Sequence, residues 1–140
     1  MLSALDISTS ALVAQRSRLD AISGNIANMS TQRNENGDVD PYQARYVVFQ
    51  TDESLKLPNG ATGVKVSSVE TETVEPNYKF EPTHPLAIQE GPREGYVAYP
   101  NVNLTMEFVD ALEATRAYEA NIGVIEVTKG LGQQTLTIIA

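Results

Sequence analysis

All seven prolines of this 140-residue chain lie between residues 41 and 100. Proline inside a helix removes a backbone hydrogen bond and clashes with the preceding turn, so only the two ends of the chain can form long, uninterrupted helices. Both ends also carry apolar residues at helical spacing. The sequence therefore predicts an α+β fold, in which two long terminal helices pack antiparallel as a coiled-coil-like layer and a small β-rich segment is inserted between them.

The first helix is predicted over residues 3–29. Ser3 and Asp6 have the spacing of a helix-starting pair, in which side-chain oxygens accept hydrogen bonds from free backbone N–H groups. One row of the helix recurs every seven residues: Leu5, Leu12, Leu19 and Ile26. The neighbouring row is half polar: Ser8, Gln15, Ile22 and Met29. This pattern indicates a seam against one other helix, roughly 40 Å long at about 1.5 Å per residue.

The second helix is predicted over residues 104–137, with Asn103 as its N-cap. One apolar row comprises Leu104, Phe108, Ala111, Thr115, Tyr118, Ile122 and Ile125. A second row lies beside it: Ala117, Ala120, Val124, Val127, Leu131 and Ile138. Two adjacent rows make an apolar arc wider than one partner helix can cover. We therefore expect neighbouring copies of the chain to cover the remainder.

The middle of the chain has the alternation and the β-branched and aromatic residues typical of strands. Strands are predicted at residues 42–50, at 63–69 and 71–74 as one strand or a bent pair, and at 77–80. Segments 34–40 and 58–63 have turn compositions. We assign residues 1–30 and 101–140 to a terminal helical assembly domain, and residues 31–100 to a small β-rich domain with loops.

Composition excludes several classes of function. The formal net charge is −8, there is no cysteine, and no cluster of Lys and Arg suits a phosphate backbone, so nucleic acid is not expected as a partner. No apolar run approaches the roughly 20 residues that span a bilayer, so direct membrane insertion is not expected. The N-terminus lacks the pattern of a cleavable signal peptide, which taken alone favours the cytoplasm.

No catalytic, cofactor or metal site is predicted. The oxygen-rich segment Asn34–Asp40 has its glycine too early for a calcium-binding EF-hand loop and reads better as a solvated turn. His84, the one histidine, has no nucleophile or orienting carboxylate nearby in sequence, and reads as a loop residue. We find neither a phosphate-binding glycine loop nor zinc-ligand spacing.

Two blocks of sequence resemble the flagellar basal-body rod protein family. Leu19-Asp20-Ala21-Ile22-Ser23-Gly24-Asn25-Ile26-Ala27-Asn28 resembles the N-terminal signature of axial proteins, and Arg116-Ala117-Tyr118-Glu119-Ala120-Asn121 the C-terminal one. Two more blocks resemble the proximal-rod type: residues 41–50 and residues 95–103. The polar segment 29–40, an insertion at Pro92-Arg93-Glu94, and the helix-weakening Gly130 and Gly132 depart from the family pattern.

The resemblance implies a structural, non-enzymatic subunit that polymerises with copies of itself and other rod subunits. The product would be a helical axial tube in the periplasmic part of the basal body, which transmits torque and surrounds the export channel. Such proteins leave the cytoplasm through the flagellar export apparatus without signal cleavage, so the missing signal peptide would not mean a cytoplasmic protein.

Two groups of residues are expected to carry assembly. Helix packing and assembly are assigned to Leu5, Leu12, Leu19, Ile22, Ile26, Leu104, Phe108, Tyr118, Ile122 and Ile125. Helix register and subunit contacts are assigned to Asn25, Asn28, Arg116 and Asn121; the alternative is that the asparagines face solvent or cap a helix, and that Asn28 simply ends the first one. Tyr96, Tyr99 and Tyr118 could anchor an interface.

Three other interpretations remain open from the sequence. The chain could be a different rod or hook-basal-body subunit. It could be a cytoplasmic coiled-coil adaptor or export chaperone, which would form a discrete oligomer. It could be a small hydrolase, which would need a concave site with perturbed titrating groups.

Overall fold

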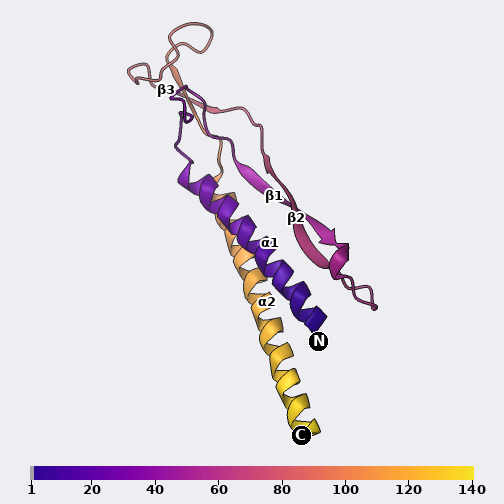
Figure 1. Cartoon of the computed structure of the whole chain (residues 1–140). Helices are drawn as coiled ribbons and strands as arrows, with labels where there is room; N and C mark the ends of the chain where they lie inside the picture. The colour runs from indigo at the N-terminus through magenta and orange to yellow at the C-terminus, as the bar shows by residue number, and fades with distance from the viewer. Residues whose placement is uncertain (1) are drawn as a thin grey trace.

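The computed structural model describes residues 2–140, with side chains from Ser3 onward; the predicted start of the helical domain at residue 1 lies outside these residues. Helix α1 (Leu2–Ala27) and helix α2 (Leu104–Ile139) run antiparallel along each other (Figure 1). The predicted α+β fold, with two long terminal helices packed together and a small β-rich segment between them in sequence, is confirmed. The α1 helix ends two residues before the predicted Met29, in a turn where Asn28 N donates to Gly24 O at 3.1 Å.

Asn103 is the N-cap of α2, as predicted, because its side chain accepts a hydrogen bond from the Met106 N–H at 3.2 Å. The helix then continues without interruption through Gly130 and Gly132 to Ile139. At 36 residues against 26, α2 is longer than α1, and its C-terminal end projects past the start of α1 (Figure 1). We call the projecting residues 131–139 the overhang.

Strands β1 (Arg45–Asp52) and β2 (Gly63–Thr71) form an antiparallel hairpin with a bulge at Val48/Phe49 and a short 3-10 helix, Glu53–Leu55, before its turn. The hairpin starts three residues later than predicted. The second predicted strand is a single strand that ends at Thr71, so the prediction is wrong only in its last part, residues 72–74. Beyond it, Glu72 N donates to Ala44 O and Val74 N to the side chain of Gln43, which leaves the strand ladder.

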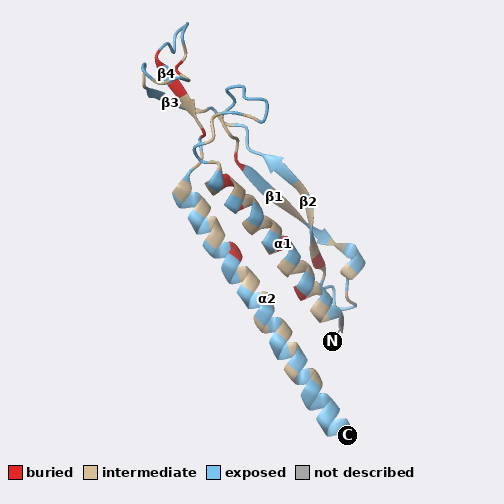
Figure 2. Cartoon of the chain, turned by 60° about the vertical axis from the view of Figure 1, so that its left-hand side comes forward, coloured by how far each residue is buried: buried red, intermediate tan, exposed pale blue. Residues whose placement is uncertain are grey.

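The hairpin lies along α1 on the side away from α2, so the molecule has three layers in the order α2, α1, hairpin (Figures 1 and 2). Ser10 fastens the hairpin to α1: its hydroxyl accepts from Val64 N at 3.1 Å and donates to Ile7 O at 2.7 Å. Gly63 is favoured beside this bond, because a Cβ there would lie 2.7 Å from Leu55 Cδ1 and 3.0 Å from both Leu55 Cβ and Ser10 Oγ. The division into a helical and a β-rich domain stays a prediction.

Strands β3 (Asn77–Phe80) and β4 (Tyr96–Tyr99) form a second, separate antiparallel pair beyond the end of the helical layer where α1 stops and α2 begins (Figure 1). The β3 strand was predicted; β4 was noticed only as a sequence block. Val97 of β4 is fully buried. Buried residues are otherwise few and separated along the elements, as Figure 2 shows, so the layers are thin. No helix within residues 2–140 is long and apolar enough to cross a membrane.

Candidate assembly interface

The seam between α1 and α2 is lined by small and polar residues on the α2 side. Along this face, buried or half-buried residues recur at alternating spacings of three and four: Leu104, Glu107, Ala111, Ala114, Tyr118, Asn121 and Ile125. Ala114 is fully buried, and its small side chain lets the two helices approach closely. Every second member thus lies one residue earlier than in the predicted row, at Glu107, Ala114 and Asn121.

Asn25 joins three elements at one point. Its side-chain oxygen accepts hydrogen bonds from the Tyr42 hydroxyl at 2.9 Å and from Arg45 N at 2.8 Å. Its amide nitrogen donates to Arg45 O at 2.8 Å and to Glu107 Oε2 at 3.2 Å. The residue is 2% exposed, and these four bonds use the full hydrogen-bonding capacity of its side chain. Asn25 therefore fixes the start of β1 and the first turn of α2 relative to α1.

Burial shifts the protonation of the two ionisable groups beside Asn25. Burial raises the pKa of the Glu107 carboxyl above its ordinary value; the hydrogen bond from Asn25 opposes this, and the charges of Asp110 and Glu72 add to it. Burial likewise raises the pKa of the Tyr42 hydroxyl, against the opposing charge of Arg45. Both shifts reflect lost hydration of the charged form.

Arg18 lies seven residues before Asn25 on α1. It makes a second polar tie, by which we mean a hydrogen bond or ion pair between α1 and α2 across the seam. Its guanidinium lies 3.3 Å from Glu113 Oε2 and 3.7 Å from Asp110 Oδ1. Together the two ties set one antiparallel register in which residues 18 and 25 face the first part of α2.

An open groove of about 540 Å³ lies between the helices and the hairpin. It is lined by residues that include Ile22, Phe49 and Glu72.

Away from the seam, α2 is mostly exposed and carries many uncovered apolar side chains. Large hydrophobic residues of this helix that remain exposed are Met106, Phe108, Val109, Leu112, Ile122, Val124, Val127, Leu131, Leu136, Ile138 and Ile139. Val127 is 65% exposed and Ile138 85%. So many exposed apolar side chains along one helix mark a surface for another protein.

Known proteins are similar to this chain in sequence. A family model described as "Flagella basal body rod protein" matches residues 5–33, and one described as "Flagellar basal body rod FlgEFG protein C-terminal" matches residues 93–138. "Flagellar basal-body rod protein FlgC" of Borreliella burgdorferi is 38% identical, over 99% of this chain and 97% of the relative. The proteins of the same name in Bacillus subtilis (39%; 96% and 95%) and Salmonella typhimurium (40%; 99% and 97%) are similar.

This chain belongs to the flagellar basal-body rod protein family. It is a structural subunit of the flagellar rod, and the resemblance seen in the sequence is confirmed. The matched segments of the rod protein cover most of α1 and of α2, which are the two helices that form the seam. The face that a rod subunit leaves uncovered is therefore the natural candidate for its contacts with other subunits.

The residues predicted to pack the helices of the rod protein differ in how far the single chain buries them. Ile22 is buried, and the half-buried group consists of Leu5, Leu12, Leu19, Ile26, Leu104, Tyr118 and Ile125. Phe108 is 57% exposed and Ile122 37% exposed, so the single chain does not use them in its own seam. Their role in assembly stays a prediction.

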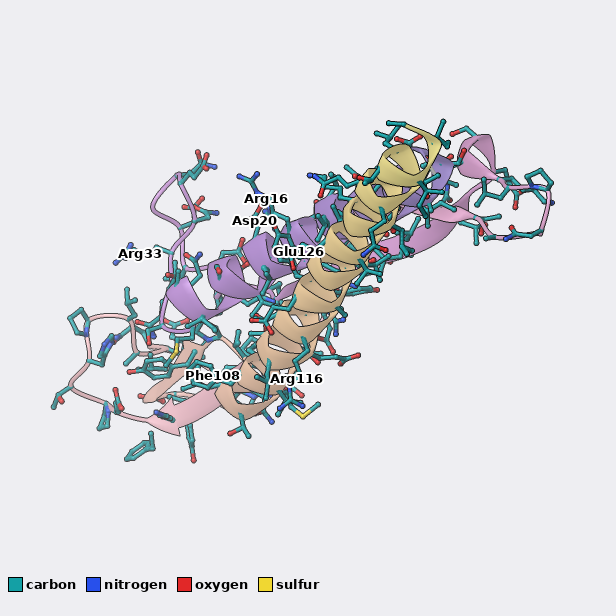
Figure 3. All side chains as sticks on the ribbon, turned by 90° about the horizontal axis from the view of Figure 1, so that it is seen from below. Arg16, Asp20, Arg33, Phe108, Arg116 and Glu126 are labelled. Carbon is teal, nitrogen blue, oxygen red and sulfur yellow. The ribbon has the colours of Figure 1, made fainter. Side chains whose placement is uncertain are left out.

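The predicted register residues are not brought together. Asn25 lies in the seam, whereas Asn28 closes α1 by donating to Gly24 O at 2.9 Å, as a helix terminator does. Asn121 donates to Ala117 O within its own helix at 2.8 Å. Arg116 is exposed on α2, in the same half of the helix as Phe108 (Figure 3). Their roles in subunit contacts stay predictions.

The sequence reasoning missed Arg18, Tyr42 and Glu107 as contributors to the seam. Arg18 could have been found, because it precedes Asn25 by one heptad and so shares its helix face. The partnership of Tyr42 with Asn25 depends on the turn after α1 and had no local signal.

The proposed aromatic anchors and the loop histidine have local partners. Tyr96 stacks edge-on against the exposed Phe80, with ring centroids 5.2 Å apart. The Tyr99 hydroxyl donates to Glu81 at 2.8 Å, which raises the pKa of Tyr99. His84 lies in a turn, where Nδ1 accepts from Leu86 N. Within residues 2–140, no group of His, Asp or Glu side chains is placed to hold a metal ion.

The two unusual loop segments also have defined structures. In the polar segment, Asn34 Oδ1 accepts from the N–H groups of Asn36 and Asp38 at 3.0 Å, which forms a tight turn closed by Gly37 in a left-handed conformation. In the insertion, Arg93 pairs with Glu75 and lies 4.0 Å above the Tyr78 ring.

Proposed function

We propose that this rod subunit polymerises, with copies of itself and other rod subunits, into a helical axial tube that transmits torque and surrounds the export channel. It reaches the periplasm through the flagellar export apparatus without a cleaved signal peptide. The work of the subunit is mechanical and uses no catalytic site and no cofactor, and it involves neither nucleic acid nor insertion into the membrane.

The observation that supports polymerisation is the amount of surface that the single subunit leaves exposed. Its accessible area is 9442 Å². A compact monomer of 15.2 kDa is expected to expose about 7,100 Å². The excess, on the order of 2,000 Å², is similar to what a stable protein–protein interface buries. The subunit therefore carries enough uncovered surface for contacts with neighbours.

The nature of this surface supports the same conclusion. Exposed apolar residues occur along α2 from Met106 to Ile139, and the overhang has no α1 beside it. Surface of this kind is costly to leave in water, at about 25 cal/mol per Å² of apolar area. Packing by neighbouring helices is the simplest way to bury it.

Fractionation of cells tests the proposal. An epitope tag inserted after Pro58, in the exposed turn between β1 and β2, should leave the helical layer intact. We expect the tagged chain to copurify with basal bodies and to restore rods and swimming to a strain that lacks the native gene. The same tag inserted after Gln133 interrupts the overhang and should abolish rod formation while the chain is still made.

Recovery of the tagged chain as a discrete cytoplasmic oligomer, with rods complete in its absence, would contradict the proposal. That result would favour the adaptor or chaperone interpretation instead.

A further inference from the structure

A narrow stripe along α1, between the faces that pack against α2 and against the hairpin, is left uncovered. Its exposed or polar members recur at spacings of four and three: Thr9, Val13, Arg16, Asp20, Ser23 and Ala27. Val13 is the apolar centre of this stripe and is 60% exposed. Arg16 and Asp20 follow it one turn apart, and Figure 3 shows both along α1. Neither forms an ion pair with another described residue.

The outer side of α2 carries a matching stripe. Its members are Val109, Leu112, Arg116, Glu119, Gly123 and Val127. Gly123 is open: a Cβ added there would have no atom within 4 Å. Arg116 and Glu119 are exposed and form no ion pair among the described residues.

The relative direction of the two stripes follows from the proposed polymer. Copies related by a screw operation along a tube all have their α1 helices pointing the same way. Because α1 and α2 are antiparallel within one chain, the α1 of one copy must be antiparallel to the α2 of the next. A contact between two different faces of the same molecule propagates from copy to copy, as a tube requires.

One antiparallel register pairs the charges. With Val13 opposite Gly123, Arg16 faces Glu119 and Asp20 faces Arg116, while the Val13 side chain fills the space that the glycine leaves. The flanking positions then set Thr9 against Val127 and Ser23 against Leu112. Both oppositely charged pairs form together, which is the arrangement that specifies partner and register in coiled coils.

The registers one heptad away are worse. Sliding the neighbour one way sets Asp20 against the apolar Phe108 and Val109, where its charge would lose hydration without a partner. Sliding it the other way keeps one pair, Arg16 with Glu126, and leaves Asp20 opposite the uncharged Ile122 and Gly123. The charges therefore discriminate between registers that the apolar residues alone would allow.

We propose that the α1 stripe of one subunit docks on the α2 stripe of a second copy of this chain, with Val13 seated at Gly123 and with the ion pairs Arg16–Glu119 and Asp20–Arg116. This inference rests on the proposed polymerisation and specifies its lateral contact. The occupant of the uncovered α2 face is thus an identical α1.

Disulfide cross-linking in assembled basal bodies tests the register. The native chain has no cysteine, so added pairs report without background. A strain co-expresses one chain with Val13→Cys and another with Gly123→Cys. Oxidation should give a covalent dimer that is absent when either variant is expressed alone. The pair Val13→Cys with Gly130→Cys, one heptad further along α2, should give no dimer because its Cβ atoms lie too far apart.

The failures are distinguishable. A dimer from the Gly130→Cys pair instead of the Gly123→Cys pair overturns the register. No dimer from either pair, in cells that swim and have complete rods, overturns the docking surface while polymerisation stands. If the wild-type chain is absent from basal bodies, as well as the cysteine variants, the proposed polymerisation itself is overturned.

Charge reversal gives a second test that needs no oxidation. Arg16→Glu alone and Glu119→Arg alone should each reduce the number of complete rods, and the double variant should restore it. Arg16→Glu combined with Glu126→Arg is the matched control for the shifted register and should not restore rods. A double variant of Arg16 and Glu119 that is no better than its worse parent overturns the inference.

Discussion

The two helices of the layer are used in opposite ways. Helix α1 is covered by α2 on one side and by the β1–β2 hairpin on another, and Val13 is its one large hydrophobic residue that is prominently exposed among the side chains from Ser3 onward. Helix α2 is covered on one side, and exposed large hydrophobic residues follow it from Met106 to Ile139. The apolar residues of α1 therefore stabilise the subunit, whereas most of those on α2 remain available to other subunits.

The same contrast exists within α2. Its first part is tied to α1 by the Asn25–Glu107 hydrogen bond and by the ion pair of Arg18 with Glu113. Its overhang, residues 131–139, has no α1 beside it (Figure 1). The ion pair is partly exposed and adds little net energy, whereas Asn25 is 2% exposed and its hydrogen bonds are shielded from water. The first part of α2 therefore has a fixed position against α1, whereas the overhang has no packing partner within the subunit.

The largest expected effect comes from Val127→Asp on the uncovered α2 face. Val127 is 65% exposed, so the free energy of unfolding of the isolated chain should change by no more than about 0.5 kcal/mol. In the rod, however, the charge would be buried without a partner, and assembly should be lost. Motility and basal-body yield provide the measurement. Val39→Asp, at a 52% exposed loop position, is the control and should keep both. Loss of assembly with both variants would remove the contrast between α2 and the loops.

Asn25→Ala should be the most destabilising change within the seam. It removes the four hydrogen bonds that Asn25 makes with Glu107, the Tyr42 hydroxyl and the Arg45 backbone N–H and C=O groups, at a cost of about 3 kcal/mol. Urea unfolding of the purified chain, followed by circular dichroism, measures it. Asn28→Ala removes one side-chain hydrogen bond, to Gly24 O at the end of α1, and should cost under about 1 kcal/mol. Equal losses of unfolding free energy in the two variants would show that the hydrogen bonds of Asn25 do not stabilise the seam more than an ordinary helix-end bond does.

Two glycine-to-alanine changes should have opposite signs. Gly130→Ala meets no atom within 4 Å and raises helix propensity, so it should stabilise the isolated chain by up to about 1 kcal/mol. Gly63→Ala places a Cβ 2.7 Å from Leu55 Cδ1 and should destabilise it. Thermal unfolding of both variants checks the signs. A destabilised Gly130→Ala chain would mean that the second half of α2 is not free in the monomer.

Glu107→Gln should have the smallest effect, visible as a change with pH. Because burial raises the folded-state pKa of Glu107 above its ordinary 4.5, the folded chain binds this proton more tightly than the unfolded chain. Its contribution to stability is therefore full below pH 4.5 and decreases as pH rises through the raised pKa. The variant should gain stability relative to the native chain between pH 4 and pH 7. Glu119→Gln controls for the loss of one exposed charge; an equal gain there would refute the assignment.

The fold could be predicted because its signals are local. Seven prolines confined to the middle, helical rows at both ends and the Asn103 cap set the two helices, and these were right to within about two residues. The β4 strand was missed because its four residues pair only with β3, and a strand this short has little pattern of its own.

The seam could be predicted only in part, because hydrophobicity was the wrong guide to which α2 face meets α1. The apolar pattern favoured Phe108 and Ile122, but the structure places Glu107, Ala114 and Asn121 there. The α1 residues that bond to α2 there include the polar Arg18 and Asn25. Matching these groups depends on pairing in space, which one sequence does not display.

The thin layering has a consequence for how the isolated subunit should melt. The heat capacity change and the denaturant dependence of unfolding both scale with the surface that unfolding newly exposes. A chain that already shows about a third more surface than a compact protein of its mass has less left to expose. Its heat capacity change should therefore fall below the usual value of about 12–15 cal/mol/K per residue. Its urea transition should be correspondingly shallow, and both quantities should rise when neighbouring subunits cover α2.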